Sequence, residues 1–313
     1  MELNKIYHLD FLNNSLPDKC AQLIIADPPY FEVKGDFDFI WKSFEHYLKD
    51  VEKWAIECKR ILADNGNLIW YGDGKKIAYS QILLDKLFNI VSNVCIHIYD
   101  RQTNKIKPED ARGFINTTER LLLYSSKDEH LNFIERDYIR SEIIKSKGRL
   151  VLKDINQALG TACNGGGVAS ACLSLDKTEP MFITEDLYKK LQSWCHPFLT
   201  KPYVELRRSY DLNRRPFTPI EQYKMDVLKF SQEGHVTGLY EHDTVKPEKL
   251  TRYLINTCSR KSDLVIVPFS GSGTECAMSA KESRNFIGFD IEKKYVDMGN
   301  KRCKTILNQT NLF

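Results

Sequence analysis

The sequence predicts an α/β fold in which a mostly parallel sheet is interrupted by one inserted region. Short apolar runs alternate with amphipathic stretches over residues 1–134, which is typical of parallel strands joined by crossover helices. The alternation stops over residues 135–225, where the sequence is irregular and polar, and it resumes over residues 226–313. A chain of 313 residues is long enough for one large α/β domain and a smaller insertion. We therefore assign 1–134 and 226–313 to one domain and 135–225 to the inserted region.

The individual elements follow from their periodicity. The run Gln22–Ala26 is short, mostly apolar and followed by Asp-Pro-Pro, which predicts a strand buried on both faces. Apolar residues then recur at alternating steps of three and four from Trp41 to Leu62, which predicts an amphipathic helix that ends at Asp64-Asn65-Gly66. Pro247 is well placed to begin a helix after the insertion. The other expected elements are strands at 67–71, 90–99, 120–125, 264–267 and 285–289 and helices at 77–88 and 274–282.

Composition excludes several classes of protein. No apolar run approaches the roughly 20 residues of a membrane span, and the N-terminus has no signal-peptide pattern, so we expect a cytoplasmic protein without a membrane partner. The nine cysteines are scattered and never spaced as C-x-x-C, which argues against a disulfide framework or a structural zinc site, and we expect no metal. The net charge of +3 does not by itself indicate a nucleic-acid partner, although clustered charges can still form a basic groove.

A glycine loop near the end of the chain predicts a site for a ligand that contains adenosine. Pro268-Phe269-Ser270-Gly271-Ser272-Gly273-Thr274 joins a predicted strand to a predicted helix, and glycines allow the backbone to approach a ligand closely. Asp290 follows about 20 residues later at the end of the next strand, where dinucleotide folds place the acid that binds ribose hydroxyls. NAD is one candidate, but the third glycine position holds Cys276 and no second nucleotide-binding half is present. S-adenosylmethionine carries an adenosine without phosphates and needs fewer glycines. A plain tight turn is the remaining alternative.

The turn Asp27-Pro28-Pro29-Tyr30 predicts chemistry on an amino nitrogen. Its two prolines fix φ and remove backbone donors, so Asp27 and the Pro28 carbonyl can present acceptors at the carboxyl end of a strand, where open α/β sheets bind ligands. The amino group of adenine or cytosine is a poor nucleophile because its lone pair is delocalised, and two acceptors on its hydrogens would free that lone pair. The base must first leave the duplex, and Tyr30 offers a ring on which it can stack. The alternative is that the turn merely ends a strand.

Taken in this order, the two motifs resemble those of the S-adenosylmethionine-dependent DNA amino-methyltransferases of prokaryotes and phages. The resemblance is to their β group, in which D-P-P-Y precedes the target-recognition region and the glycine motif comes last, and it covers most of the chain except about 135–200. It implies a Rossmann-like methyltransferase sheet, mostly parallel and circularly permuted, with the strand at Phe286 near the strand at Tyr7. It also implies that 1–134 and 226–313 form the methyltransferase catalytic domain and that 135–225 is the target-recognition region.

The resemblance implies roles for individual residues. Asp27, Pro28, Pro29 and Tyr30 would form the catalytic motif, in which the acid binds the target amino group and the tyrosine stacks on the flipped base. The segment 242–247 is similar to the family's H-x-T-x-K-P motif, which helps to bind the cofactor. Family members often have an acid before Pro-Phe in the glycine motif, a position that Val267 occupies here. The residues expected to contact S-adenosylmethionine are Asp10, Asp27, His242, Thr244, Lys246, Pro268, Phe269, Ser270, Gly271, Ser272, Gly273, Thr274 and Asp290.

We therefore expect a site-specific DNA adenine-N6 methyltransferase that moves a methyl group from S-adenosylmethionine to a flipped-out adenine in double-stranded DNA. Asp27 favours adenine, because cytosine-N4 members of the family more often begin this motif with serine. The alternatives are a cytosine-N4 enzyme, an RNA or protein amide methyltransferase, and a nucleic-acid-binding module that has lost catalysis. The resemblance implies a bacterial or phage-infected cell, and it leaves open a homodimer and a cognate restriction endonuclease as partners.

Two basic segments are the expected contacts with DNA. Lysine and arginine contacts to phosphates supply most of the non-specific affinity for DNA, and arginine also reads guanine. One segment follows a predicted strand near the proposed pocket, and the other lies among aromatic residues. For the second segment, a solvated helix face paired with Glu205 and Asp211 is an equal alternative. The residues are Arg101, Lys105, Lys107 and Arg112 in the first segment and Arg207, Arg208, Arg214 and Arg215 in the second.

Overall fold

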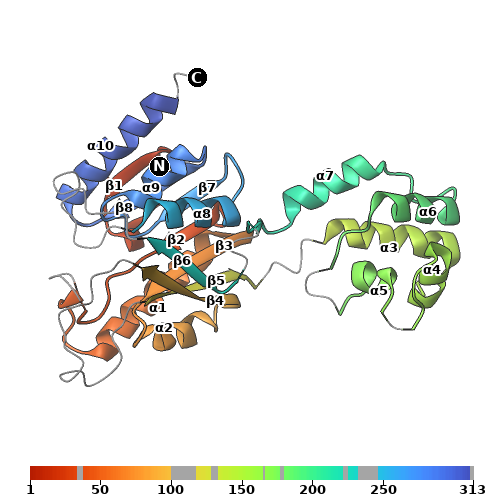
Figure 1. The fold of residues 1–313 in the computed structure, drawn as a ribbon, viewed down its shortest axis with the longest axis horizontal. Coiled ribbons are helices and arrows are strands. Elements are labelled where there is room, and N and C mark those ends of the chain that lie inside the picture. Colours follow the sequence, from red (N-terminus) through yellow and green to blue (C-terminus); the bar gives the residue numbers. More distant parts are fainter. Residues whose placement is uncertain are drawn as a thin grey trace. The chain divides into compact units, whose positions relative to one another are not determined.

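The computed structural model describes residues 1–33, 38–99, 118–127, 133–164, 166–176, 180–220, 225–231 and 246–310. The chain divides into two units. We call Met1–Lys127 with Arg215–Phe313 the sheet unit and Asp128–Arg214 the helical unit. In Figure 1 the helical unit is the yellow-green to green segment with helices α3 to α7.

Within the described residues, the sheet unit contains one eight-stranded sheet in the order β1-β8-β7-β2-β3-β5-β4-β6 (Figure 1). Strand β5 is antiparallel to both of its neighbours, β3 and β4, and the other adjacent pairs are parallel. The strands are β1 Lys5–His8, β2 Ala21–Ala26, β3 Leu62–Gly72, β4 Phe88–Tyr99, β5 Thr118–Ser126, β6 Val227–Ser231, β7 Leu264–Val267 and β8 Asn285–Asp290. The helices of this unit are η1 Phe11–Asn13, α1 Phe44–Ile61, α2 Ile77–Leu84, α8 Glu248–Cys258, α9 Thr274–Lys281 and α10 Lys293–Thr310.

Strands from the two ends of the chain pair in this sheet. Strand β1 is parallel to β8, with Tyr7 opposite Phe289, as the expected circular permutation requires. Strand β7 lies between β8 and β2, and Leu23 of β2 pairs with Val265 of β7. The prediction of a mostly parallel, circularly permuted α/β sheet is therefore confirmed.

Helices cover both faces of the sheet, which explains why its central strands are continuously apolar. Helices α8, α9 and α10 pack with Ile25 and Tyr71 on one face, whereas α1 and α2 pack with Ile24 and Trp70 on the other. Residues Leu23–Ala26 are at most 1% exposed. Trp70 and Tyr71 are consecutive and both fully buried, because successive side chains of a strand point to opposite faces.

The inserted region is helical rather than irregular. It contains α3 Ile134–Lys147, α4 Leu152–Leu159, α5 Val168–Leu173, α6 Glu185–Cys195 and α7 Tyr203–Asn213. These helices share their own core, in which Tyr188 and Leu191 are fully buried. Two of these helices escape prediction because α4 has 8 residues and α5 has 6, too few for an apolar stripe to repeat clearly.

The boundaries of the helical unit differ from the expected 135–225. The unit ends at Arg214, because the residues that follow are attached to the sheet. Asn67, fully buried in β3, donates from Nδ2 to the carbonyl oxygen of Pro216 at 2.8 Å, and its Oδ1 accepts from Arg215 Nη1 at 2.9 Å. The backbone N–H of Thr218 donates to the carbonyl oxygen of Thr257 at 2.9 Å. Residues 215–218 therefore belong to the sheet unit.

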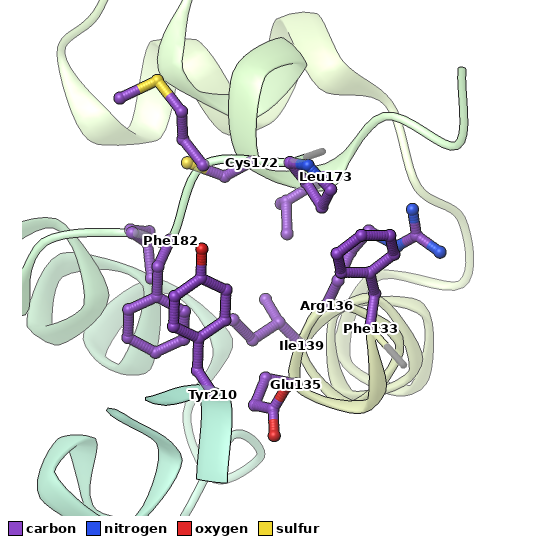
Figure 2. Close-up of a pocket in the computed structure, with 11 residues that line it drawn as sticks. Phe133, Glu135, Arg136, Ile139, Cys172, Leu173, Phe182 and Tyr210 are labelled. Carbon is purple, nitrogen blue, oxygen red and sulfur yellow. The ribbon is translucent and has the colours of Figure 1, made fainter. Parts of the chain in front are cut away.

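A pocket lies inside the helical unit (Figure 2). Its lining is mainly apolar and aromatic, and the rings of Phe182 and Tyr210 stack with centroids 4.5 Å apart. Glu135 also lines it, and Glu135 Oε1 accepts hydrogen bonds from Ser209 and Asn213. The residues that line this pocket belong to neither predicted motif, so it is a feature of the insertion.

Candidate active site

The carboxyl ends of β2 and β7 bring the two predicted motifs together. Asp27 follows the last residue of β2, and the glycine loop follows Val267, the last residue of β7. Because the two strands are adjacent and parallel, both motifs leave the sheet at the same edge. The side chain of Asp27 is 22% exposed, so the carboxylate is accessible from solvent.

Two neighbouring side chains hold the Asp27 carboxylate. The Tyr30 hydroxyl donates to Asp27 Oδ1 at 2.7 Å, and Lys246 Nζ lies 3.2 Å from Asp27 Oδ2. Lys246 Nζ also donates to Glu119 Oε2 at 3.0 Å, and the Tyr30 backbone N–H donates to Asp38 Oδ1 at 2.6 Å. A carboxylate has about four lone-pair positions, so these contacts orient Asp27 and leave it able to accept further hydrogen bonds.

Lys246 is a buried cation in this cluster. The residue is 7% exposed, and its Nζ lies 4.5 Å from the centroid of the Tyr71 ring. Burial opposes the charged form, but the carboxylates of Asp27 and Glu119 outweigh it and hold the pKa of Lys246 above its ordinary value. The ammonium therefore stays charged at neutral pH. Its predicted contact with a cofactor stays a prediction, since the structure places Nζ on two carboxylates.

Tyr30 belongs to the same cluster. Burial, and then the negative charge of Asp27, raises the pKa of Tyr30 well above its ordinary value. The phenol therefore stays protonated and donates to Asp27. The expected stacking of this ring on a flipped base stays a prediction.

The end of the next strand is tied to the glycine loop through Asp290. Asp290 Oδ2 accepts from the Gly271 backbone N–H at 2.8 Å, and Oδ1 accepts from the Glu292 N–H at 2.9 Å. Burial raises the pKa of Asp290, while these two N–H groups lower it. Each oxygen keeps a lone pair that a ribose hydroxyl could use.

The glycine loop owes its shape to close packing against α10. Gly273 has φ +72°, and a Cβ there would lie 2.7 Å from the Cα of Gly299 in α10, so only glycine fits. The side chains of Ser270, Ser272 and Thr274 are at most 5% exposed. A ligand at this loop would therefore meet mainly backbone groups.

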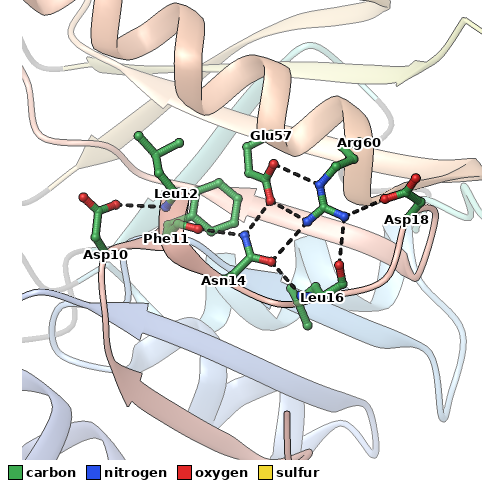
Figure 3. Close-up of polar contacts among 8 residues, drawn as sticks. All are labelled: Asp10, Phe11, Leu12, Asn14, Leu16, Asp18, Glu57 and Arg60. Atoms are coloured by element: carbon green, nitrogen blue, oxygen red, sulfur yellow. Dashed lines mark hydrogen bonds and ion pairs between the residues drawn. The ribbon is translucent and has the colours of Figure 1, made fainter.

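The segment between β1 and β2 is fixed by Arg60 of α1 (Figure 3). The Arg60 guanidinium contacts Glu57 Oε1 and Asp18 Oδ1 at 2.6 Å each and donates to the Leu16 carbonyl oxygen at 2.8 Å. Asn14 Nδ2 donates to Glu57 Oε1 at 2.5 Å. This network holds the chain against the helix between the two strands.

Asp10 lies at the start of this segment and caps η1. Its Oδ1 accepts from the backbone N–H of Leu12 at 2.9 Å, and the residue is exposed (Figure 3). The adjacent Phe11 packs against Phe269 of the glycine loop and Phe289 of β8, with ring centroids 6.3 and 5.6 Å apart. The residue that follows Asp10 is therefore in contact with the glycine loop. The role of Asp10 in binding adenine stays a prediction.

Two acids in this region carry no recognisable motif and escaped sequence reasoning. Glu119 lies at the start of β5 and reaches Lys246. Glu275 lies in the first turn of α9, is 6% exposed, and has an Oε1 atom with no hydrogen-bond partner in the described structure. Glu275 alone leaves a signal in the sequence, an acid inside an element of small and apolar residues, which is uncommon because buried charges are costly.

The predicted DNA contact of Arg215 is corrected by the structure. Arg215 is 9% exposed and donates to Asn67 inside the sheet unit, so its guanidinium is a structural anchor. Arg207 forms two hydrogen bonds with Asp211, at 2.8 and 3.0 Å, and Arg214 contacts the same carboxylate at 3.3 Å. Arg208 is exposed on α7.

Some predicted site residues fall outside the described residues. These are His242 and Thr244 of the cofactor set and Arg101, Lys105, Lys107 and Arg112 of the DNA set. Within the described residues, no helix combines the length and hydropathy needed to cross a bilayer, and no group of side chains could hold a metal ion.

An acid-bearing turn beside a glycine loop, on a permuted α/β sheet, defines an amino-methyltransferase site. The chain belongs to the N6/N4 DNA methylase family, whose model matches residues 21–301. It is 25% identical over 311 residues to the DNA adenine methyltransferase YhdJ of Escherichia coli (strain K12), and the match covers 96% of this chain and 83% of that protein.

Solved structures of methyltransferases share the fold. The complex of M1.HpyAVI with SAM superposes with a TM-score of 0.55 and 17% identity, over 95% of this chain and 98% of that one. The cytosine-N4-specific PvuII DNA methyltransferase gives a TM-score of 0.55 and 13% identity, over 97% of this chain and 91% of that one. At these identities the likeness establishes the fold alone.

Proposed function

We propose that this protein is a site-specific DNA adenine-N6 methyltransferase that uses S-adenosylmethionine and acts on an adenine flipped out of double-stranded DNA. The observation that carries the proposal is the position of the Asp27 carboxylate. It is held by Tyr30 and Lys246 at the carboxyl end of β2, next to the strand that carries the glycine loop. The similarity to an adenine methyltransferase over most of the chain supports adenine as the target.

Asp27 would act on the target amino group as an acceptor. Its carboxylate keeps free lone pairs after the contacts with Tyr30 and Lys246. Together with the Pro28 carbonyl oxygen it can accept the two amino hydrogens, which draws the nitrogen toward tetrahedral geometry and frees its lone pair. A strong base is not needed, because the proton becomes acidic once the nitrogen is methylated.

The residues around the glycine loop fit S-adenosylmethionine. Ser270 Oγ is buried with no hydrogen-bond partner in the described structure, and the Asp290 oxygens keep lone pairs for ribose hydroxyls. Gly273, with φ +72°, lets the loop pack against Gly299 of α10 and so fixes the backbone that a ligand would meet. When bound, the cofactor would supply an electrophilic methyl group on a sulfonium. The chain's own residues would bind the ribose at Asp290 and orient the target amino group at Asp27.

The helical unit is the proposed target-recognition region. Arg208 is exposed on α7, and Arg207 and Arg214 share Asp211 on the same helix. An arginine paired with one acid can still reach a phosphate, so α7 is the proposed DNA contact of this unit. A homodimer, a cognate restriction endonuclease and a cytoplasmic location remain expectations of the family resemblance.

The test is methyl transfer from labelled S-adenosylmethionine to duplex DNA, followed by digestion to nucleosides. We expect label in N6-methyladenine, and N4-methylcytosine would instead support the alternative target. Asp27→Ala should lower the rate by on the order of 10²–10³-fold or more while S-adenosylmethionine still binds. Asp297→Ala, which changes an exposed acid on α10, is the matched control. Full activity of Asp27→Ala, or transfer to RNA or protein and none to DNA, would contradict the proposal.

A further inference from the structure

Glu275 is a buried acid that the proposed chemistry does not yet use. It directly follows the glycine loop in the first turn of α9. The residue is 6% exposed, and its Oε1 has no hydrogen-bond partner within the described residues. A buried carboxylate oxygen without a donor is costly, so the position calls for a functional explanation.

The charged groups that face Glu275 come from three other elements, and the phenol of Tyr71 in β3 also interacts with it. Asp27, at the end of β2, adds negative charge, whereas Lys246, before α8, and Arg302, on α10, add positive charge. Both cations have other carboxylates as hydrogen-bond partners. Lys246 donates to Glu119 at 3.0 Å, and Arg302 donates to Glu248 at 2.6 Å.

The balance of these charges leaves Glu275 short of a counter-ion. Burial, and then the charge of Asp27, raises the pKa of Glu275 to about 7, and a hydrogen bond from its own backbone, followed by the charges of Lys246 and Arg302, offsets this only in part. A further positive charge at this position would therefore be favoured, and it would hold Glu275 in its ionised form.

The reaction places such a charge beside Asp27. The target amino group would lie at Asp27, so the sulfonium that faces it must lie close by, within the electrostatic reach of Glu275. Methyl transfer breaks the S–CH₃ bond and forms an N–CH₃ bond. The sulfur keeps the bonding electron pair and becomes a neutral thioether, and the amino nitrogen releases a proton to solvent. The positive charge is thus present before transfer and absent after it.

We propose that Glu275 makes the site prefer the cofactor over the product, whose sulfur carries no charge, because the carboxylate of Glu275 balances the sulfonium of S-adenosylmethionine. The inference rests on the proposed function. Glu275 would also favour exchange of the product S-adenosylhomocysteine for fresh cofactor, because the product leaves the carboxylate without its counter-charge.

Calorimetric titration with S-adenosylmethionine and S-adenosylhomocysteine tests this directly. At pH 8, Glu275→Gln should weaken binding of S-adenosylmethionine about tenfold and leave binding of S-adenosylhomocysteine within about twofold. Glu185→Gln, which changes an exposed acid on α6, should leave both affinities unchanged. An unchanged ratio of the two affinities in Glu275→Gln, or an equal loss for both ligands, would overturn the inference.

The pH dependence of the wild-type protein gives an independent reading that needs no variant. The ratio of the affinity for S-adenosylmethionine to that for S-adenosylhomocysteine should rise between pH 6 and pH 8 as Glu275 ionises. The rise should be absent from Glu275→Gln. Any pH dependence that remains in Glu275→Gln comes from titration of the ligands and is subtracted. Glu275→Asp, which keeps the charge, should retain part of the preference. If the wild type binds neither ligand, the proposed function fails. If it binds both with a ratio that does not change with pH, only the role of Glu275 fails.

Discussion

Replacing Glu275 with glutamine should stabilise the ligand-free protein, and the gain should depend on pH. An acid whose pKa is higher in the folded state than in the unfolded state keeps its proton longer when folded. Between the two pKa values the unfolded chain therefore holds fewer protons, and stability falls as pH rises. Glutamine resembles the protonated acid and does not titrate, so Glu275→Gln removes this loss.

The size of the stability gain follows from the shift in the pKa of Glu275. The pKa of Glu275 rises from 4.5 to about 7 in the fold, and one pKa unit corresponds to about 1.4 kcal/mol. Ionising this buried group above pH 7 should cost on the order of 3 kcal/mol. At pH 5 only the unfolded chain has begun to ionise, and the cost should be about 1 kcal/mol or less.

Urea unfolding without ligand measures the unfolding free energy of the wild type and of Glu275→Gln at pH 5 and at pH 8. The chain has four tryptophans, and a Trp194→Phe background leaves Trp41, Trp54 and Trp70, all in the sheet unit, as fluorescence reporters. The variant should gain on the order of 3 kcal/mol at pH 8 and much less at pH 5. An equal effect at both pH values, or a less stable variant at pH 8, would refute the assignment of a raised pKa to Glu275.

Three further substitutions test the packing of the glycine loop, the anchoring of Arg215 in the sheet unit and the contact of α7 with DNA. Gly273→Ala places a Cβ 2.7 Å from Gly299 at φ +72°. The variant should lose about 1–3 kcal/mol of unfolding free energy and bind S-adenosylmethionine more weakly in calorimetry. A fully stable variant would show that the loop can move aside. Arg215→Ala leaves the buried Asn67 Oδ1 without this donor, so urea unfolding should show a loss of about 1–3 kcal/mol, with an unchanged salt dependence of DNA binding. Arg208→Ala should leave the unfolding free energy unchanged and weaken DNA binding. The slope of log affinity against log salt concentration should fall by about one. An unchanged slope would show that Arg208 of α7 does not contact DNA.

Local pattern was enough for the order of the motifs and for the strands of the sheet other than β6, which was not predicted. The buried run at β2 and the strand, loop and helix around Gly271 each carry their signal within a few residues. The pairing of β1 with β8 follows once the glycine strand is placed at the centre of the sheet.

Features that depend on distant partners could not be predicted in this way. Glu119 and Glu275 are ordinary acids in sequence, and only the fold brings them to Lys246 and Asp27. Arg215 shows the opposite error, because a basic, aromatic stretch suggested a surface, whereas the buried Asn67 fixes that side chain inside.

The pairing of β2 with β7 has a consequence for synthesis of the chain. Gln22 Oε1 accepts a hydrogen bond from the backbone of Leu264, 242 positions later. At about 5–20 residues per second, a ribosome needs roughly 10–50 s to supply the partner of β2. During that interval one edge of an apolar strand is unpaired and open to association with other chains. We therefore expect growth at reduced temperature, which slows association of unfinished chains, to raise the soluble yield of the protein.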